Sequence, residues 1–391
     1  MASLPWSKQL AENLAERKAV GRYRQQRTRL GAQGVEVVVD GKPLLSFCSN
    51  DYLGLANHPD LKKAFIDAAE QEGVGAGAAH LLTGHSHYHQ QLEEELADFM
   101  GHEKALLFSS GYQANLGVID GLMVRGDAII QDKLNHASLL DGARLSEADL
   151  LRYPHADISR LHKRLHTASA AKHKLIVTDG VFSMDGDVAP LAEIIAEAKQ
   201  HKAAVFVDDA HGLGVLGEQG RGSVSHCNIK QDERPIIMGT FGKAFGTAGA
   251  FVAADEEVID TLIQQAHTYV YTTAQPAAIA AATLASLKLV QDENWRREKL
   301  QALIAQFRAG AKGLGLNLMD SSTPIQPVLV RDDKKAIAIG KSLEEKGILV
   351  GVIRPPTVPE GSARLRITLS ANHSEQQVQQ LLDALEVICT D

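Results

Sequence analysis

The fold of this chain is decided by the stretch 204–212, AVFVDDAHG, in which a short apolar run ends in two aspartates, a histidine and a glycine. Similar apolar runs recur at Ala105–Phe108, Ala128–Gln131, Leu175–Thr178, Ile236–Met238 and Ala250–Val252. Helical patterns alternate with them at Asp60–Glu72, His89–Met100, Ala114–Val124 and Pro190–His201. Because strands that alternate with helices form parallel sheets covered on both faces, we predict a large α/β unit with a mostly parallel sheet.

The two ends of the chain have other patterns. Residues 4–30 are typical of an amphipathic, arginine-rich helix, and a strand pair is predicted over 35–47 around the turn Asp40-Gly41. After residue 285 a long amphipathic helix and a mixture of strands and helices are predicted. The expected division is therefore an N-terminal arm over 1–48, a large domain over 49–285 and a smaller α+β domain over 286–391.

The composition narrows the class of protein. The chain has 40 Lys and Arg against 48 Asp and Glu, a formal net charge of −8, which argues against a general nucleic-acid binder. Its three cysteines are far apart, so no disulfide framework is expected. No signal peptide and no apolar run of 18 residues is found, so we expect a soluble, cytoplasmic protein without a membrane span.

Chemically useful residues follow the predicted strands, at the sheet edge where ligands bind in α/β proteins. Lys243 lies in a glycine-rich turn after the 236–238 run, and its amine can form a Schiff base if burial lowers its pKa. Asp208 and His211 follow the 204–207 run and suit a bound nitrogen heterocycle. The carboxylate can hold a ring nitrogen protonated, and the imidazole can bond to a neighbouring hydroxyl.

Three further segments reach the same edge. The segment Ser109–Asn115 opens a helix, whose free N–H groups can bind an anion, although Ser109 or Ser110 as a simple helix cap explains the same pattern. His136 follows one strand and the polar loop 179–187 follows another. A phosphate site, a carboxylate for a pyridinium nitrogen and a Schiff-base lysine together specify pyridoxal 5′-phosphate (PLP).

An ordered set of motifs makes nearly the whole chain resemble the α-oxoamine synthases, a family of fold-type-I PLP-dependent transferases. The motifs are NDYLGL at 50–55, SGY at 110–112, NHAS at 135–138, DGVFSMDGD at 179–187, VDDAHG at 207–212 and TFGK at 240–243. The resemblance implies a homodimer with shared active sites that joins an amino acid to an acyl thioester with loss of CO2. The stretches IRPPTVP at 353–359 and ARLRIT at 363–368 look most like the members that condense L-alanine with a pimeloyl thioester in biotin biosynthesis.

The resemblance also implies a role for each matching residue. Lys243 carries PLP as a Schiff base and moves the α-proton, Asp208 bonds to the pyridinium nitrogen, and His136 stacks on the ring and faces the substrate. The other residues expected at the cofactor are Gly111, Tyr112, Ser183, His211 and Thr240. The expected substrate contacts are His136, Arg24, Thr357 and Arg366, with Arg366 as the clamp for the carboxylate. Thr272 and Thr273 are expected to reach the phosphate of a neighbouring subunit.

Rival functions make separate predictions. The stretch 212–217, GLGVLG, fits a dinucleotide-binding pattern, but the glycines after it argue against the helix that a pyrophosphate needs. His80, His85, His87 and His89 form a cluster, yet their spacing matches no defined ligand motif, so no metal site is predicted. A non-catalytic binding protein would not be expected to keep Lys243 together with Asp208.

Sibling enzymes of the same family share this core. They join glycine to acetyl-CoA (glycine C-acetyltransferase) or succinyl-CoA, or serine to a long acyl thioester. The sequence leaves open which acyl chain fits, and whether its carrier is CoA or acyl carrier protein.

Overall fold

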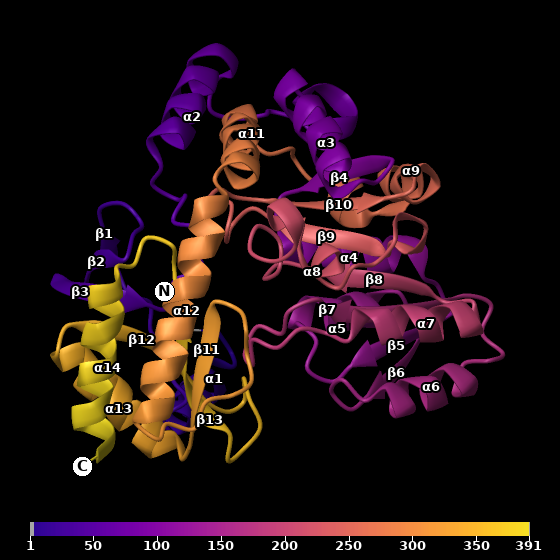
Figure 1. Ribbon diagram of the computed structural model, residues 1–391. Helices are drawn as coiled ribbons and strands as arrows, with labels where there is room; N and C mark the ends of the chain where they lie inside the picture. Colours follow the sequence, from indigo (N-terminus) through magenta and orange to yellow (C-terminus); the bar gives the residue numbers. More distant parts are fainter. Residues whose placement is uncertain (1–3, 391) are drawn as a thin grey trace.

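The computed structural model describes residues 4–390 and contains two β-sheets with helices packed around them (Figure 1). The larger sheet has the strand order β4-β10-β9-β8-β7-β5-β6. Its strands are β4 (Lys104–Phe108), β5 (Ala128–Asp132), β6 (Asp149–Tyr153), β7 (Lys174–Asp179), β8 (Ala204–Asp208), β9 (Ile236–Thr240) and β10 (Ala250–Ala254). The strands from β9 to β6 are parallel, and β10 is antiparallel to both of its neighbours. The predicted mostly parallel sheet is confirmed.

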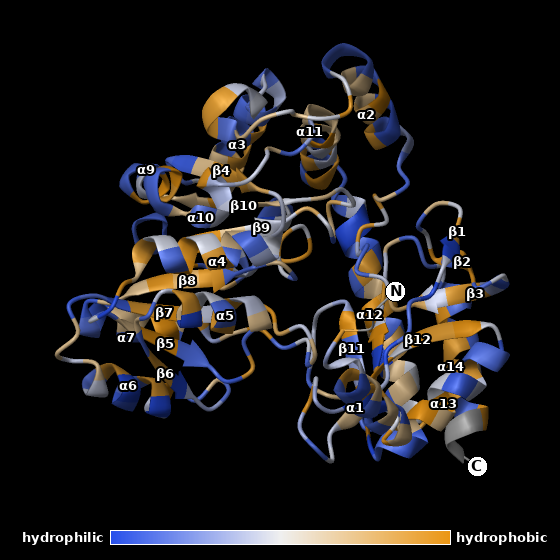
Figure 2. Cartoon of the chain, turned by 180° about the vertical axis from the view of Figure 1, so that it is seen from behind, coloured by the Kyte–Doolittle hydropathy of each residue, from blue (hydrophilic) through white to orange (hydrophobic). Residues whose placement is uncertain are grey.

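Both faces of this sheet are buried, which explains the continuous apolar runs in the sequence. Ile129 and Phe206 pack into one hydrophobic cluster, whereas their neighbours Ile130 and Val207 pack into the other, and all four side chains are fully buried. Figure 2 shows β7 and β8 as hydrophobic, between helices that carry hydrophilic residues on their outer faces. The alternation of side chains along each strand therefore divides the core into two layers.

The larger sheet is covered by helices that the sequence predicts only in part. They are α2 (Pro59–Glu72), α3 (His87–Met100), α4 (Gly111–Leu122), α5 (Ala137–Leu145), α6 (Ile158–Thr167), α7 (Leu191–His201), α8 (Ser223–His226), α9 (Glu256–Gln265), α10 (His267–Val270) and α11 (Ala277–Asp292). Helices α2, α3, α4 and α7 were predicted, and the remaining ones were not. The alanine-rich α11 packs against α2 and α3, and the predicted domain boundary after residue 285 falls within it.

The smaller sheet has the strand order β1-β2-β3-β12-β13-β11. Its strands are β1 (Arg29–Leu30), β2 (Glu36–Val39), β3 (Lys42–Phe47), β11 (Ile325–Arg331), β12 (Ile348–Ile353) and β13 (Ala363–Thr368). The predicted hairpin turns at Asp40 and Gly41, which both have the positive φ that a two-residue hairpin turn requires. Because β3 pairs with β12 in parallel, residues 29–47 share a sheet with the C-terminal part of the chain.

Helices α12 (Asn294–Gly313), α13 (Asp333–Glu345) and α14 (Glu375–Thr390) accompany the smaller sheet. The prediction of a helix over residues 4–30 is wrong about its length, since α1 covers only Ser7–Ala19. It buries none of its residues, so no packing favours its extension, and Gly21 then takes a left-handed conformation. Among the described residues, no helix is long and apolar enough to cross a membrane.

Candidate active site

A cavity of about 190 Å³ lies where the parallel strands of the larger sheet end. Its lining includes all eight residues that the resemblance assigns to the cofactor: Gly111, Tyr112, His136, Ser183, Asp208, His211, Thr240 and Lys243. Asn115, Asp179, Ala210 and Met238 complete the lining. The fold thus brings residues from α4, β7, β8, β9 and the loops after them to one place.

Asp208 ends β8 and is buried. Its Oδ2 accepts a hydrogen bond from Asn115 Nδ2 at 2.7 Å, and its Oδ1 accepts one from the backbone N–H of Ala210 at 3.0 Å. Asn115 also donates to Ser138 Oγ at 2.8 Å. Sequence reasoning gave Asn115 no role, although its place one turn into α4, on the buried face, could have indicated one.

Lys243 lies in the turn after β9 and is half-buried. Burial lowers the pKa of its amine to about 8, against the opposing effect of the negative charges of Asp208 and Asp179. Among the described residues, none accepts a hydrogen bond from its Nζ. About a tenth of this amine is neutral at pH 7, far more than for an exposed lysine, so the group is suited to attack a carbonyl.

Asp179 is a second carboxyl group in the cavity that sequence reasoning left without a role. Burial and the charge of Asp208 raise its pKa well above the ordinary value. Its Oδ1 accepts a hydrogen bond from the backbone N–H of His136 at 3.1 Å, and this bond fixes the loop that carries the histidine. The His136 ring lies nearly perpendicular to the Tyr112 ring, with the centroids 6.3 Å apart, and its Nδ1 lies 2.7 Å from Ser138 Oγ.

A hydrogen-bonded chain joins His211 to the arginine expected to bind a carboxylate. Tyr52 Oη lies 2.7 Å from His211 Nδ1 and donates to Asn50 Oδ1 at 3.2 Å. Arg366 donates from Nε to Ser183 O at 2.6 Å, and its terminal nitrogens reach Asn50 Oδ1 at 3.4 Å. Burial and the positive charges of Lys243 and Arg366 lower the pKa of His211 well below 6.5, so this imidazole is neutral at pH 7.

The first turn of α4 faces the cavity with Gly111 and Tyr112. Their N–H groups have no preceding helical carbonyl, so they are available to an anion. Ser110 is the N-cap and accepts from the N–H of Gln113 at 3.3 Å, so the capping that the sequence left as an alternative occurs beside the anion site. Thr240 Oγ1 lies at the end of β9 and donates to Gly249 O at 2.9 Å.

The model of the family described as "Aminotransferase class I and II" matches residues 42–385. The chain belongs to this family. The alignments of this aminotransferase-family chain with two relatives cover nearly their full length. It is 58% identical over 379 residues to the 8-amino-7-oxononanoate synthase of Saccharophagus degradans, covering 96% of this chain and 95% of that one. It is 59% identical over 372 residues to the enzyme of the same name from Nitrosococcus oceani, covering 95% and 98%.

Solved structures agree with this membership. An 8-amino-7-oxononanoate synthase from Francisella tularensis matches with a TM-score of 0.78 at 33% identity, over 89% of this chain and 98% of that one. A serine palmitoyltransferase from Sphingomonas wittichii matches with a TM-score of 0.93 at 33% identity, over 100% and 98%. A structure described as SPT with a PLP internal aldimine also matches with a TM-score of 0.93, at 30% identity over 99% of both chains.

Of the four residues predicted to contact substrate in this aminotransferase-family chain, only His136 lines the cavity. Arg366 does not line it, although it is hydrogen-bonded to Ser183, which does; Arg24 and Thr357 lie farther outside. Arg24 is exposed and lies after the end of α1, so the expectation of helix-borne arginines around it is wrong. Thr357 is exposed in the loop after β12. The two segments lie side by side, because the Arg354 guanidinium donates to the backbone oxygen of Gly21. Thr272 and Thr273 also lie outside the cavity, in the loop before α11.

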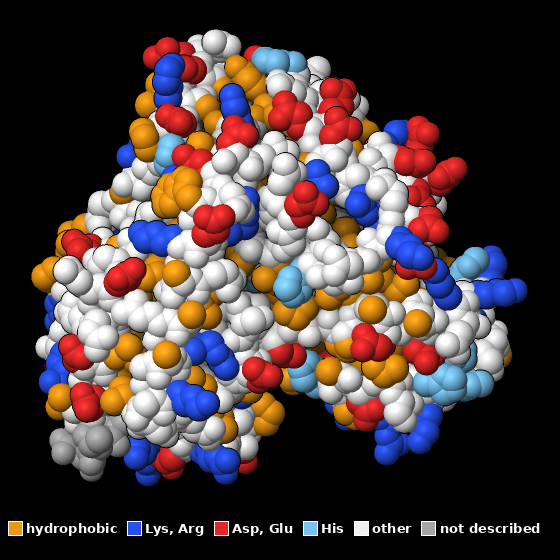
Figure 3. All heavy atoms as spheres, viewed as in Figure 1, with side chains coloured by type: hydrophobic (Ala, Val, Ile, Leu, Met, Phe, Trp, Pro, Cys, Tyr) orange, Lys and Arg blue, Asp and Glu red, His pale blue; other side chains and the backbone are white. Residues whose placement is uncertain are grey.

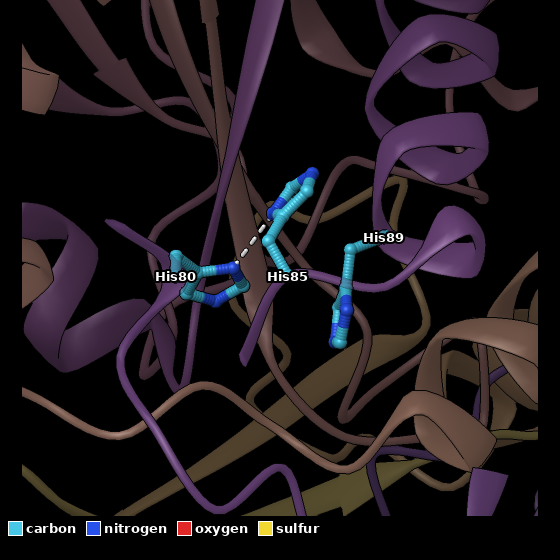
Figure 4. A group of neighbouring side chains, drawn as sticks. All are labelled: His80, His85 and His89. Atoms are coloured by element: carbon cyan, nitrogen blue, oxygen red, sulfur yellow. Dashed lines mark hydrogen bonds between the residues drawn. The ribbon is translucent and has the colours of Figure 1, made fainter. Parts of the chain in front are cut away.

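The motifs behind the rival functions have structural explanations. Residues 211–217 form turns instead of the start of a helix, so the glycine pattern lacks the N–H groups that hold a pyrophosphate. His80, His85 and His89 do meet, as Figure 4 shows, whereas His87 is exposed beside Glu72. Glu93, on α3 beside this group, accepts a hydrogen bond from the N–H of Leu107 at 2.9 Å, and burial raises its pKa to about 8.

Proposed function

We propose that this chain condenses L-alanine with a pimeloyl thioester, with loss of CO2 and the carrier thiol, to give 8-amino-7-oxononanoate for biotin biosynthesis. One observation supports the choice of substrates: the relatives named 8-amino-7-oxononanoate synthase are 58 and 59% identical over almost the whole chain. The serine palmitoyltransferase, a sibling with other substrates, is 33% identical. The enzyme is thus a PLP-dependent acyltransferase of this family.

The cavity fits PLP in three respects. Lys243 presents an amine that no described side chain holds, and its lowered pKa favours reaction with an aldehyde. The N-terminal turn of α4 offers N–H groups of Gly111 and Tyr112 to a phosphate, and the Thr240 hydroxyl would turn from Gly249 O to donate to it. Asp208 offers a carboxylate to a ring nitrogen. When bound, PLP accepts the electrons that remain at the α-carbon of the amino acid after a bond to it breaks.

Asp208 keeps the ring nitrogen of the cofactor protonated in this proposal. Its two oxygens are held by the amide of Asn115 and the N–H of Ala210, so the carboxylate cannot rotate away from that nitrogen. His211 bonds to the ring hydroxyl, and Tyr52 fixes the orientation of its imidazole at 2.7 Å. His136 covers one face of the ring, on a loop anchored by Asp179.

Lys243 and Arg366 act on the amino acid. With a pKa of about 8, the Lys243 amine can take the α-proton of alanine and return it near neutral pH. Arg366 is held beside the cavity by hydrogen bonds to Ser183 O and Asn50, and in this proposal its guanidinium binds the alanine carboxylate. A fixed carboxylate keeps the bond that is lost as CO2 in the orientation that the reaction requires.

The acyl thioester approaches from the surface where Arg24 and Thr357 lie, since both are exposed in adjoining segments outside the cavity. Arg24 is suited to an anionic group of the substrate, and the carrier is CoA or acyl carrier protein.

We also propose a homodimer. An apolar groove of about 400 Å³ between α2 and the Gly246–Ala248 turn exposes Phe65 and Ile66, as expected of a subunit contact. Thr272 and Thr273 reach the phosphate site of the partner in this dimer.

Steady-state assays of alanine, glycine and serine, each with pimeloyl-, acetyl- and succinyl-CoA, test the proposal. We expect alanine with pimeloyl-CoA to give the highest kcat/KM, and 8-amino-7-oxononanoate as the product by mass spectrometry. Preference for glycine with acetyl-CoA would overturn the substrate assignment and leave the PLP chemistry in place. A protein that shows no visible PLP absorbance and does not bind added PLP would overturn both.

A further inference from the structure

Three histidines far along the sheet from the catalytic cavity form a compact group on the surface. His162 and His166 lie one turn apart on α6, and His201 is the last residue of α7. One ring nitrogen from each lies within 4.8 Å of the others. Figure 3 shows histidine side chains gathered on the surface where α6 and α7 lie, so the group is open to solvent.

The arrangement of the three rings matches that of imidazoles around one metal ion. The ring centroids are 4.6 Å apart for His162 and His166, 5.2 Å for His162 and His201, and 4.9 Å for His166 and His201. The rings are nearly perpendicular to one another, so they do not stack. Three imidazoles bound tetrahedrally at about 2.0–2.1 Å from a zinc ion have centroids about 5 Å apart.

Glu197 gives His162 the tautomer that a metal ligand needs. Its Oε2 lies 2.8 Å from His162 Nδ1, which therefore donates its proton to the carboxylate and leaves the lone pair on Nε2 free. A carboxylate that orients a histidine through its second nitrogen is a common support of metal ligands. Glu197 is one turn before His201 on α7, with its Oε2 3.7 Å from His201 Nε2.

The two helices that carry the three histidines pack against each other. The helices themselves are fixed, because Leu161 and Leu165 of α6 are fully buried under the sheet.

In the other two candidate groups, every histidine has at least one ring nitrogen in a hydrogen bond. His89 Nδ1 accepts the N–H of Ser86 at 3.0 Å, so its Nε2 carries the proton, and His80 and His85 bond to each other through Nδ1 at 2.9 Å (Figure 4). His155 is bonded through both nitrogens to carboxylates, at 3.2 Å to Asp132 and 2.9 Å to Asp187. The group on α6 and α7 differs from both, because among the described residues the only hydrogen bond to its ring nitrogens is the one between Glu197 and His162 Nδ1.

We propose that His162, His166 and His201 bind one Zn²⁺ ion, with Glu197 as the residue that positions His162. Imidazole nitrogens suit zinc, and three of them leave a fourth position for water. The ion links α6 to α7, and through them the edge strand β6 to the middle of the sheet. This role is separate from the proposed reaction, whose residues all lie elsewhere.

Isothermal titration of the untagged, chelator-treated holoenzyme with ZnCl2 tests the proposal. We expect one site per chain, at least tenfold weaker binding after His166→Ala, and about 10- to 100-fold weaker binding after Glu197→Gln. Cobalt in place of zinc gives an independent readout, because a tetrahedral Co²⁺ site absorbs visible light, and this band should disappear in His162→Ala. Zn²⁺ should also raise the melting temperature of the wild type and not that of His166→Ala.

His226→Ala is the matched control, because His226 is an exposed histidine on the short helix α8, outside the group. It should bind zinc like the wild type, and all the variants should keep their PLP absorbance. Wild-type affinity in His166→Ala, or equal losses in His166→Ala and His226→Ala, would overturn the assignment. Absence of zinc binding by the wild-type protein would overturn it as well.

Discussion

Removal of the Asn115 amide should weaken PLP binding, because this amide holds the Asp208 carboxylate. Asn115 is buried, and its Nδ2 is one of two donors to the Asp208 carboxylate, at 2.7 Å. In Asn115→Leu the side-chain volume is similar, so the main change is the loss of the donor. One oxygen of a buried carboxylate then has no partner.

The size of the effect follows from that lost bond. A hydrogen bond to a charged group contributes about 1.5–3 kcal/mol, and 1.4 kcal/mol corresponds to a factor of ten. Because the bond is present before PLP binds, its full value of about 2 kcal/mol is an upper limit, and the Kd for PLP should rise by up to about 30-fold. Asn115→Asp should weaken binding further, because it puts a second carboxylate beside Asp208 and repulsion replaces the hydrogen bond.

The assay is titration of the apoenzyme with PLP, followed by visible absorbance, with melting temperatures recorded in parallel. Gln131→Leu is the control, because Gln131 is an equally buried amide whose Nε2 donates to the neutral Leu139 O at 2.8 Å, away from Asp208. It should lose stability and keep its PLP affinity. Equal Kd values for Asn115→Leu and the wild type would refute the reasoning, as would an equal rise in Gln131→Leu.

Three other predictions concern single residues. Lys243→Ala should lose the visible absorbance of bound PLP and almost all turnover. In the wild type, the rate at which the apoenzyme combines with PLP should rise with pH through about 8, because the Lys243 amine becomes neutral. A rate that does not depend on pH would contradict this. Arg366→Lys should raise the KM for alanine about tenfold or more, because the bidentate contact with the carboxylate is lost. Initial rates measured against alanine concentration test this. Burial lowers the pKa of His155, but hydrogen bonds to Asp132 and Asp187 outweigh it and raise the pKa to about 10. The protonated His155 imidazole therefore stabilises the fold fully below about pH 6.5, and this stabilisation is lost as pH rises toward 10. The free energy of unfolding in urea should depend more steeply on pH for the wild type than for His155→Gln.

The sequence was sufficient for six of the seven strands of the larger sheet, because these strands are buried on both faces and stand out as apolar runs. Strand β6 was missed because it is an edge strand with mixed residues, DLLRY, in which only Tyr153 is buried. Helix α11 was missed because most of its side chains are buried, so it shows no polar face. The helix expected around Arg24 failed for the opposite reason: its pattern was amphipathic, but no surface packs against it.

The eight residues predicted at the cofactor line one cavity. Lys243, Asp208, His211 and His136 were singled out because they lie at or after the ends of predicted strands, which meet at one edge of a parallel sheet, whereas Gly111, Tyr112, Ser183 and Thr240 received their roles from the resemblance to the family. Asn115 and Tyr52 were not assigned roles because their functions depend on contacts over long sequence distances, with Asp208 and His211. Such contacts appear only when the fold is known. The histidine group on α6 and α7 was missed likewise, since His201 joins the i, i+4 pair His162 and His166 only through the packing of two helices.

The parallel pairing of β3 with β12 sets an order of events during synthesis. Leu45 pairs with Ile348, so its strand leaves the ribosome roughly 300 residues before its neighbour in the sheet. The hairpin of β2 and β3 must wait with one edge unpaired, and a two-stranded hairpin is only marginally stable alone. The turn with Lys243, strand β8 with Asp208, and helix α4 can fold earlier, because the larger sheet is complete once Ala254 has emerged. We therefore expect a nascent chain that ends after α11 to form the larger sheet while residues 29–47 remain accessible to proteases and chaperones.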